Sequence, residues 1–328
     1  MLKNPLLFIY KTVSKHKIEM KKIAFSLLTI VVFQAFAQES RTKYFGHKPP
    51  GLKAELFNGG GLVEHPKGEK RSFNISFSPD GEEMFFSYFK ATKEKPEPTY
   101  EIKTFKLINN EWIGPKTASF SGQYSDVDIS FSPDGNYIFF SSDRPQPNSI
   151  GLDIYYSVKM KKGWSEPIYA GTNINTTEGE VYPSISKKNN IFFRSSRKGG
   201  YGDDDLYRAE WVNGNFVNVR NLGPNVNSTY GESNSVIAPD ESYILFCTSR
   251  PESGNNQHIY ISFQIKENIW SKAVSVGNEV NTEAGAGSPT LSPDGKYLFF
   301  KKTKKPSRGI YWISTKTFEE LKPVKNEH

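Results

Sequence analysis

Three acidic residues occupy the same position in three copies of a repeated motif: Asp126, Glu180 and Glu232. In the same three copies, the second strand of the motif ends on an arginine: Arg144, Arg197 and Arg250. A guanidinium group can hold a carboxylate with two parallel hydrogen bonds, whereas an ammonium group cannot. We therefore interpret the six residues as structural ion pairs, and we expect each arginine to lower the pKa of its acid.

The same carboxylates also allow a catalytic interpretation. Glycoside hydrolysis uses a pair of carboxyl groups, one of them a general acid with a raised pKa. If Asp126, Glu180 and Glu232 converged on a central pocket, a carbohydrate-active enzyme, glycosidase-like or lyase-like, would be the alternative function. The sequence contains no GxSxG, HExxH or phosphate-binding loop that would indicate another enzyme class.

The first and last copies differ from the other three. They have lost the acid, which is replaced by Ser72 and Ala286, and their second strands end on Lys90 and Lys304. We expect these two lysines to have no partner, and their loops to merge into one anion-binding patch. The predicted members are Lys90, Lys93, Lys95, Lys301, Lys302, Lys304, Lys305 and Arg308. A solvated charged loop is the alternative interpretation.

Other reactive residues give weaker signals. The run Asp203 to Asp205 lacks the spaced acid pattern of a calcium loop, and Asp205 is the expected counterpart of Asp153. The histidines are scattered, without the paired spacing of metal ligands. Cys247 falls on a predicted strand as a buried apolar side chain. We therefore predict no metal site and no cofactor.

The acids and bases are carried by a hairpin that the chain repeats. FSPDGNYIFFSSDR, residues 131–144, recurs at residues 77–90, 237–250 and 291–304, with a degraded copy at 185–197. The turn aspartates are separated by 54, 106 and 54 residues: Asp80, Asp134, Asp240 and Asp294. Strand-rich units repeating at about 40–50 residues are typical of a β-propeller.

Each unit holds four strand signals, which in the second unit are residues 128–132, 137–142, 153–158 and 164–170. The fifth unit nearly ends after its third strand, and residues 53–57 resemble the missing fourth one. The sequence thus predicts an all-β fold, a single β-propeller of four-stranded antiparallel blades closed by an N-terminal strand. Five blades are expected, with six as the alternative.

The Ser-Pro-Asp-Gly turns need a residue in the left-handed conformation at the glycine position. Two copies break this rule. Glu241 replaces the glycine in the fourth copy, and Lys187 to Asn190 replaces the whole turn in the third. Asparagine tolerates a positive φ, so the second departure is the milder one.

The chain at this point resembles a known family, the TolB-like propellers built from WD40-like SPDG repeats. The matching features are the SPDG turns, the SSDR and TSR endings, GLDIYYS at residues 151–157, DDLYRA, and the NINT and NVNS links. The resemblance covers roughly residues 52–314. It implies the fold, and it leaves function open, because such propellers include binding modules, partner-docking domains and parts of peptidases and lyases.

A secretory signal peptide is predicted to begin at Met20. Two lysines precede the short apolar stretch 23–36, and Ala35-Phe36-Ala37 suits cleavage after Ala37. The stretch is too short and too polar for a transmembrane anchor. The expected organisation is a signal region at 1–37, a linker at 38–51, the propeller at 52–314, and a C-terminal tail at 315–328 that could form a short helix.

Charge and cysteine content limit the partners. The 328 residues carry 42 basic and 35 acidic side chains, but residues 1–37 hold six lysines and one glutamate. The remainder has 36 basic and 34 acidic groups, a net charge of +2, which does not favour nucleic-acid binding. A single cysteine excludes an internal disulfide. We expect a periplasmic or extracellular monomer that acts as a binding or scaffold module for a cell-envelope protein or an acidic glycan.

Overall fold

The computed structural model describes residues 43–59, 72–90, 99–147, 149–253, 256–304 and 306–323. The chain divides into two compact units, Met1–Lys48 and Pro49–His328. Within the described part of the first unit, Lys43–Gly46 forms a short 3-10 element, η1. The predicted signal peptide lies outside the described residues. No helix in the described parts of the chain is long and apolar enough to cross a membrane.

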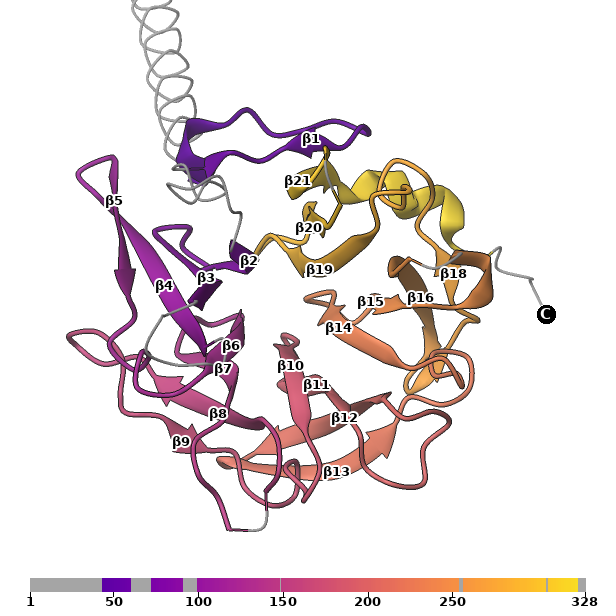
Figure 1. Cartoon of the computed structure of the whole chain (residues 1–328), viewed down its shortest axis with the longest axis horizontal. Helices are drawn as coiled ribbons and strands as arrows, with labels where there is room; N and C mark the ends of the chain where they lie inside the picture. Colours follow the sequence, from indigo (N-terminus) through magenta and orange to yellow (C-terminus); the bar gives the residue numbers. More distant parts are fainter. Residues whose placement is uncertain are drawn as a thin grey trace, which may run out of the picture. The chain divides into compact units, whose positions relative to one another are not determined.

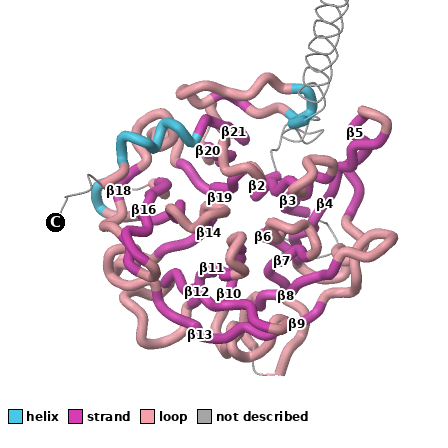
Figure 2. The backbone as a smooth tube through the Cα atoms, turned by 180° about the vertical axis from the view of Figure 1, so that it is seen from behind, coloured by secondary structure: helices cyan, strands magenta, loops and turns pink. Residues whose placement is uncertain are grey.

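The second unit is a five-bladed β-propeller, as predicted (Figure 1). Each blade is an antiparallel sheet, and in blades 1 to 4 the strands follow chain order from the centre outward (Figure 2). Blade 1 contains β2 Ser72–Phe77, β3 Glu83–Lys90, β4 Thr99–Ile108 and β5 Glu111–Thr117. Blade 2 contains β6 Asp126–Phe131, β7 Tyr137–Ser142, β8 Asp153–Val158 and β9 Ile168–Tyr169. Blade 3 contains β10 Glu180–Ile185, β11 Asn190–Ser195, β12 Asp205–Val212 and β13 Asn215–Asn221.

The last two blades depart from this pattern at their outer edges. Blade 4 contains β14 Glu232–Ile237, β15 Tyr243–Thr248 and β16 His258–Lys266, and its outer strand is broken into β17 Ile269–Trp270 and β18 Val274–Ser275. Blade 5 contains β19 Ala286–Leu291, β20 Tyr297–Lys302 and β21 Gly309–Ser314, with β1 Glu55–Leu56 as its outer strand. The described part of this unit also contains two short 3-10 elements, η3 Pro251–Ser253 and η4 Thr315–Leu321.

The ring closes as the sequence predicts. β1 pairs antiparallel with β21, Glu55 opposite Trp312 and Leu56 opposite Tyr311. Next to β1, Phe57 is fully buried, with its ring centroid 5.1 Å from Phe299 of blade 5 and 6.3 Å from Phe77 of blade 1. The N-terminal strand therefore completes the last blade, and Phe57 fills the junction between the last blade and the first.

The links named in the family resemblance have a structural role. Asn175 accepts a hydrogen bond from the backbone N–H of Ile154 at 2.8 Å and donates to its carbonyl at 3.0 Å. Asn227 does the same with Leu206, and Asn281 with Ile259. Each side-chain amide thus forms hydrogen bonds with the backbone of the third strand. It takes the place of the outer strand, which does not extend that far. These motif residues position the links and are not free to bind a ligand.

The two irregular turns compensate for each other. Glu241 adopts the predicted left-handed conformation, with φ of 65°, and its side chain is only 2% exposed. Its carboxylate crosses to the degraded turn of blade 3, where it accepts hydrogen bonds of 2.6 Å from Ser186 and from Asn190. In other blades the matching serine binds its own turn aspartate, for example Ser132 with Asp134 at 2.5 Å. Glu241 supplies the carboxylate that the third turn lacks.

Candidate functional site

The structure brings each predicted acid to its predicted arginine. Arg144 contacts Asp126, Arg250 lies 3.1 Å from Glu232, and Arg197 lies 3.6 Å from Glu180. All three acids are fully buried. A buried carboxylate held by a cation and by neighbouring donors is typical of a structural contact.

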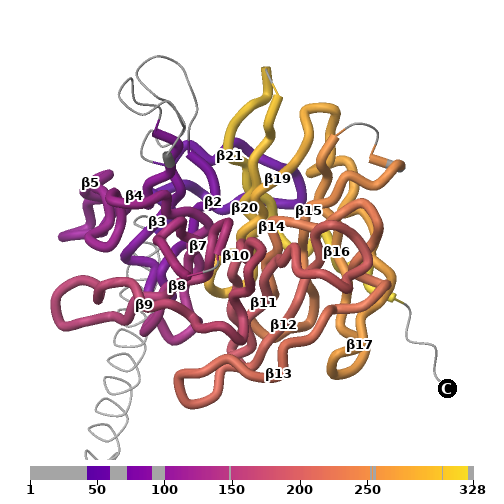
Figure 3. Tube along the Cα trace, turned by 60° about the horizontal axis from the view of Figure 1, so that its bottom comes forward, coloured from indigo at the N-terminus to yellow at the C-terminus, as the bar shows by residue number. Residues whose placement is uncertain are grey.

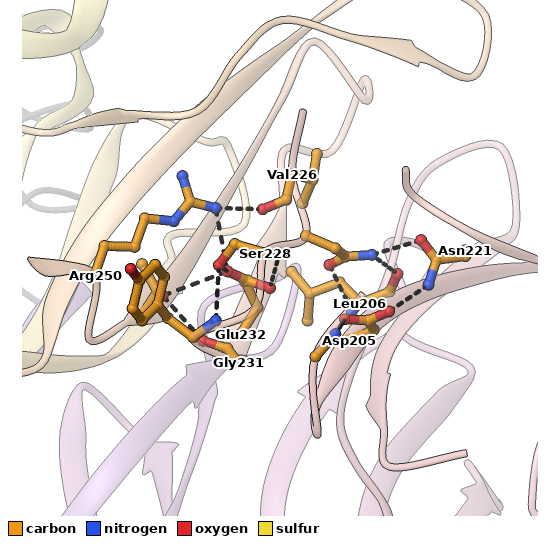
Figure 4. Close-up of polar contacts among 12 residues, drawn as sticks. Asp205, Leu206, Asn221, Val226, Ser228, Gly231, Glu232 and Arg250 are labelled. Atoms are coloured by element: carbon orange, nitrogen blue, oxygen red, sulfur yellow. Dashed lines mark hydrogen bonds and ion pairs between the residues drawn. The ribbon is translucent and has the colours of Figure 1, made fainter. Parts of the chain in front are cut away.

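Glu232 illustrates the network (Figure 4). It accepts hydrogen bonds from the backbone N–H and the hydroxyl of Ser228 at 2.8 and 2.6 Å. Arg250 binds Glu232 with one nitrogen and the same nitrogen donates to the carbonyl of Val226 at 2.6 Å. Its guanidinium also lies 5.8 and 5.2 Å from the ring centroids of Phe246 and Tyr260.

The other two sets repeat this arrangement. Arg144 and Arg197 each donate to a link carbonyl, of Phe120 and Ile174 respectively. Each also stacks on rings of its own second and third strands: Phe140 and Tyr155 for Arg144, Phe193 and Tyr207 for Arg197. Each arginine follows the second strand of its blade and binds a carbonyl of the segment that enters that blade. The arginines therefore hold the segments that connect one blade to the next.

Burial adds an effect on these carboxyl groups that the sequence did not indicate. Burial raises the pKa of both Asp126 and Glu232, although Arg144 and Arg250 lower it as expected, because burial is the larger effect. A raised pKa alone would suit a general acid. Because the acids are fully buried and none of them lines the central cavity described below, a substrate has no access to them in this structure.

The lysines at the closing seam are only partly as predicted. Lys90 is not without a partner: its ammonium lies 2.7 Å from Glu101 of β4, and this contact raises its pKa. Lys304 contacts the side-chain oxygen of Asn256. The expectation that both lack partners is therefore wrong. Neither partner occupies the repeat position of Asp126, Glu180 and Glu232, from which the expectation was drawn. Lys93, Lys95 and Lys305 lie outside the described residues.

Lys301 is the member of the predicted patch with the most unusual surroundings. It lies on β20 of blade 5, which neighbours β2 of blade 1 (Figure 3). Its ammonium lies 5.1 Å from the ring centroid of Phe73, a residue of β2. Burial, and to a smaller extent the charge of Arg308, lower its pKa to about 8. The described residues include no acid within salt-bridge distance of Lys301. Lys302 lies 4.5 Å from the Tyr311 ring.

The structure also shows a group of residues that the sequence analysis missed. One residue in the innermost strand of each blade has a left-handed backbone, with φ between 47° and 61°: Asn74, Asp128, Tyr182, Asn234 and Ser288. A break in strand register accompanies each of them. Such bulges redirect side chains. The residues stand six positions before the turn aspartate or its counterpart, so comparing the repeats column by column would have found them.

Four of these residues, all but Ser288, line a central cavity of about 100 Å³ that extends to the SPDG turns. Asp128 is the one carboxyl among the lining residues. Burial raises its pKa to about 8, although Asn74 donates a hydrogen bond to it. Asp128 is therefore predominantly protonated at pH 7.

The remaining predicted residues lie where the repeat places them. Asp205 is the counterpart of Asp153, since they pair with Ser195 and Ser142 at equivalent positions of blades 3 and 2. Asp205 accepts hydrogen bonds from the backbone of Tyr201 and Gly202. Cys247 is fully buried on β15. Among the described residues, no group of three or more potential ligands is placed to hold a metal ion.

No protein-family model and no curated protein matches the chain, but many solved structures resemble it. TolB from Acinetobacter baumannii is 18% identical, and the match covers 76% of this chain and 53% of that chain, with a TM-score of 0.49. A TolB structure from Agrobacterium tumefaciens is 17% identical over 70% of this chain and 69% of that one, with a TM-score of 0.47. An α-L-arabinofuranosidase from Podospora anserina is 11% identical over 80% and 94%, with a TM-score of 0.45.

The chain thus spans about half the length of the Acinetobacter baumannii TolB. These similarities concern the fold alone. The protein is a five-bladed β-propeller, with TolB structures among those similar to it.

Proposed function

We propose that the protein is an exported, non-catalytic binding propeller of the bacterial cell envelope, which holds an anionic group at its closing seam. Lys301 is the central residue of this site, and Arg308 lies near it. Lys302, the next residue of β20, faces the other side of the sheet, over the Tyr311 ring. The anionic group belongs to an acidic glycan, a lipid phosphate or a protein partner. Export is supported by the signal-peptide pattern of residues 20–37.

The observation that carries the proposal is the half-buried, cationic position of Lys301. Its ammonium is removed from water, lies over the Phe73 ring, and is repelled by Arg308. Burial and the repulsion by Arg308 both disfavour its charge, so a bound anion near the two cations would stabilise the charged form. With a predicted net charge near zero for residues 38–328, long-range attraction to an anion must come from this local group and not from the whole surface.

A non-catalytic role is supported by the placement of the carboxyl groups. Asp126, Glu180 and Glu232 are buried within the arginine networks. The central cavity contributes one carboxyl, Asp128, whereas glycosidases ordinarily need two at a set separation. The enzyme alternative would be favoured by hydrolysis of an oligosaccharide that is abolished in a normally folded Glu180→Gln variant.

The binding test compares the wild type with Lys301→Met, titrated with alginate oligosaccharides and, separately, with inorganic phosphate. The matched control is Lys296→Met, which removes an exposed lysine paired with the turn residue Asp294. Losing one partly desolvated cation is worth about 1 kcal/mol, so binding should weaken about fivefold in Lys301→Met and not in the control. Wild-type binding should also weaken with salt. Equal binding by all three proteins would contradict the proposal.

A further inference from the structure

The carboxyl group of Asp153 is buried without a hydrogen-bond partner. Asp153 is the first residue of β8 in blade 2 and is 1% exposed, and its neighbour across the sheet on β7 is the uncharged Ser142. Neither of its side-chain oxygens has a partner among the described residues, and neither has the hydroxyl of Ser149. Buried polar groups in folded proteins are nearly always hydrogen-bonded, so this carboxyl group is an exception.

Blade 3 shows what the missing partners would be. Asp205, the counterpart of Asp153, accepts hydrogen bonds from the backbone N–H groups of Tyr201 and Gly202 at 2.6 and 3.1 Å. A third hydrogen bond comes from the side-chain amide of Asn221 at 2.7 Å (Figure 4). Three donors thus satisfy the carboxyl group at the equivalent position of the next blade.

Blade 2 cannot form the same arrangement. Three positions before the aspartate, Ile150 stands where blade 3 has Gly202. A Cβ atom on Gly202 would lie 2.5 Å from the carbonyl oxygen of Ser228, so a side chain does not fit there. Asn221 and Tyr169 both pair with the residue two places after the aspartate, but Tyr169 makes no hydrogen bond to the carboxyl group. The donors of blade 3 are therefore lost in blade 2.

The surroundings of Asp153 disfavour its negative charge. Burial raises its pKa to about 6; the nearby Ser149 hydroxyl partly opposes this, and the carboxylate of Glu180 on β10 adds to it. Tyr155 of β8 and Tyr169 of β9 also interact with the carboxyl group, and because burial raises their own pKa values, both are uncharged near neutral pH. The structure described here therefore suits the protonated form of Asp153.

Residues 149–151, which precede β8 and lie against Asp153, are weakly held. The N–H of Ser149 donates to the carbonyl of Gln146 at 3.4 Å, and the N–H of Ile150 donates to the carbonyl of Thr177 at 3.3 Å. Both distances are long for hydrogen bonds of this kind. The Ile150 side chain is 84% exposed, so it adds little packing. A local opening of this segment should therefore cost little free energy.

We propose that residues 149–151 form a pH-sensitive segment, which packs over Asp153 when the carboxyl group is protonated and opens to water when it is ionised. Water then supplies the hydrogen-bond donors that the protein supplies to Asp205 in blade 3.

The direction of the effect follows from proton binding. The closed segment binds the proton of Asp153 more tightly than the open segment does, because the pKa is about 6 when closed and has the ordinary value of 3.8 when exposed. The stabilisation of the closed form is fully present below pH 3.8 and is lost as the pH rises through about 6. The equilibrium constant for opening should therefore rise about tenfold between pH 5 and pH 7.

The test is amide hydrogen–deuterium exchange of residues 149–151 at pH 5 and pH 7, corrected for the intrinsic pH dependence of exchange. We expect about tenfold less protection at pH 7 in the wild type. Asp153→Asn, which resembles the protonated acid, should show equal protection at both pH values. Residues 201–204 of blade 3 are the matched control in the same sample, because the aspartate that follows them has its partners, and their protection should not show this change.

A control variant and a folding check complete the test. Asp205→Asn should keep the wild-type response at residues 149–151. Thermal melting establishes that the variants are folded; if Asp153→Asn is not, Asp153→Ala removes the same charge. The proposal is overturned if protection of residues 149–151 in the wild type does not depend on pH, or if the variant at Asp153 responds as the wild type does. An equal response of residues 201–204 would also overturn it, because the change would then be global.

Discussion

Asp128→Asn should stabilise the protein, and the gain should depend on pH. The carboxyl of Asp128 has a pKa of about 8 in the folded protein, against an ordinary value of 3.8 for aspartate, and burial is the main cause. The folded state therefore binds its proton more tightly than the unfolded state. The stability that this proton contributes is fully present below pH 3.8 and is lost as the pH rises toward 8.

The size of the effect follows from these two values. Each unit of pKa difference corresponds to about 1.4 kcal/mol, so at pH 7 retaining a proton on Asp128 costs at most about 4 kcal/mol. Asparagine resembles the protonated acid and can still accept the hydrogen bond from Asn74. The variant should gain up to this amount in unfolding free energy at pH 7 and almost nothing at pH 4.

The assay is urea unfolding of wild type and variant at pH 4, 5.5, 7 and 8, analysed by linear extrapolation. Asp134→Asn is the control with the opposite sign. Although burial opposes its ionisation, hydrogen bonds from Ser132 and Asn136 lower the pKa of Asp134, so its neutralisation should cost stability at pH 7. A stability difference between Asp128→Asn and wild type that does not change with pH would refute the reasoning.

Three further predictions concern stability. Glu241→Gly should lower the urea midpoint although glycine is the usual residue there, because the carboxylate holds Ser186 and Asn190; losing it costs about 1–3 kcal/mol. Phe57→Ala should cost about 3–5 kcal/mol of unfolding free energy, and deletion of residues 38–60 should abolish the cooperative transition in calorimetry. Glu180→Gln should lower the melting temperature, by about 1–3 kcal/mol of stability, because an amide nitrogen replaces one of the carboxyl oxygens and an acceptor for Ser195 and Thr176 is lost. An unchanged unfolding curve in any of these variants would contradict its prediction.

The repeat made the architecture predictable. Turn spacing near 54 residues predicts the blade number, and the missing outer strand of the fifth unit predicts closure by residues 53–57. The joint occurrence of acid and arginine in repeats two to four predicts their contacts, because covariation between copies reports proximity. These features depend on residues that recur at fixed positions.

The partners of Lys90 and the role of Glu241 were not predictable in the same way. Lys90 pairs with Glu101 of the neighbouring strand, and Glu241 binds a turn in another blade. The first contact lies within blade 1 and the second joins blades 3 and 4, so neither follows from residues that recur at fixed positions of the repeat. The raised pKa of Asp126 was not predictable either, because the depth of burial, which outweighs Arg144, is a property of the folded ring.

The proton balance of anion binding at Lys301 tests the proposed function most directly. At pH 8 the free ammonium is about half protonated, since its pKa is about 8. A bound anion raises that pKa, so binding should take up as much as about half a proton per site. Calorimetric titration with alginate oligosaccharides at pH 8, in two buffers of different ionisation enthalpy, should show this uptake in the wild type and not in Lys301→Met. Binding without proton uptake, or equal uptake by both proteins, would contradict an anion site centred on Lys301.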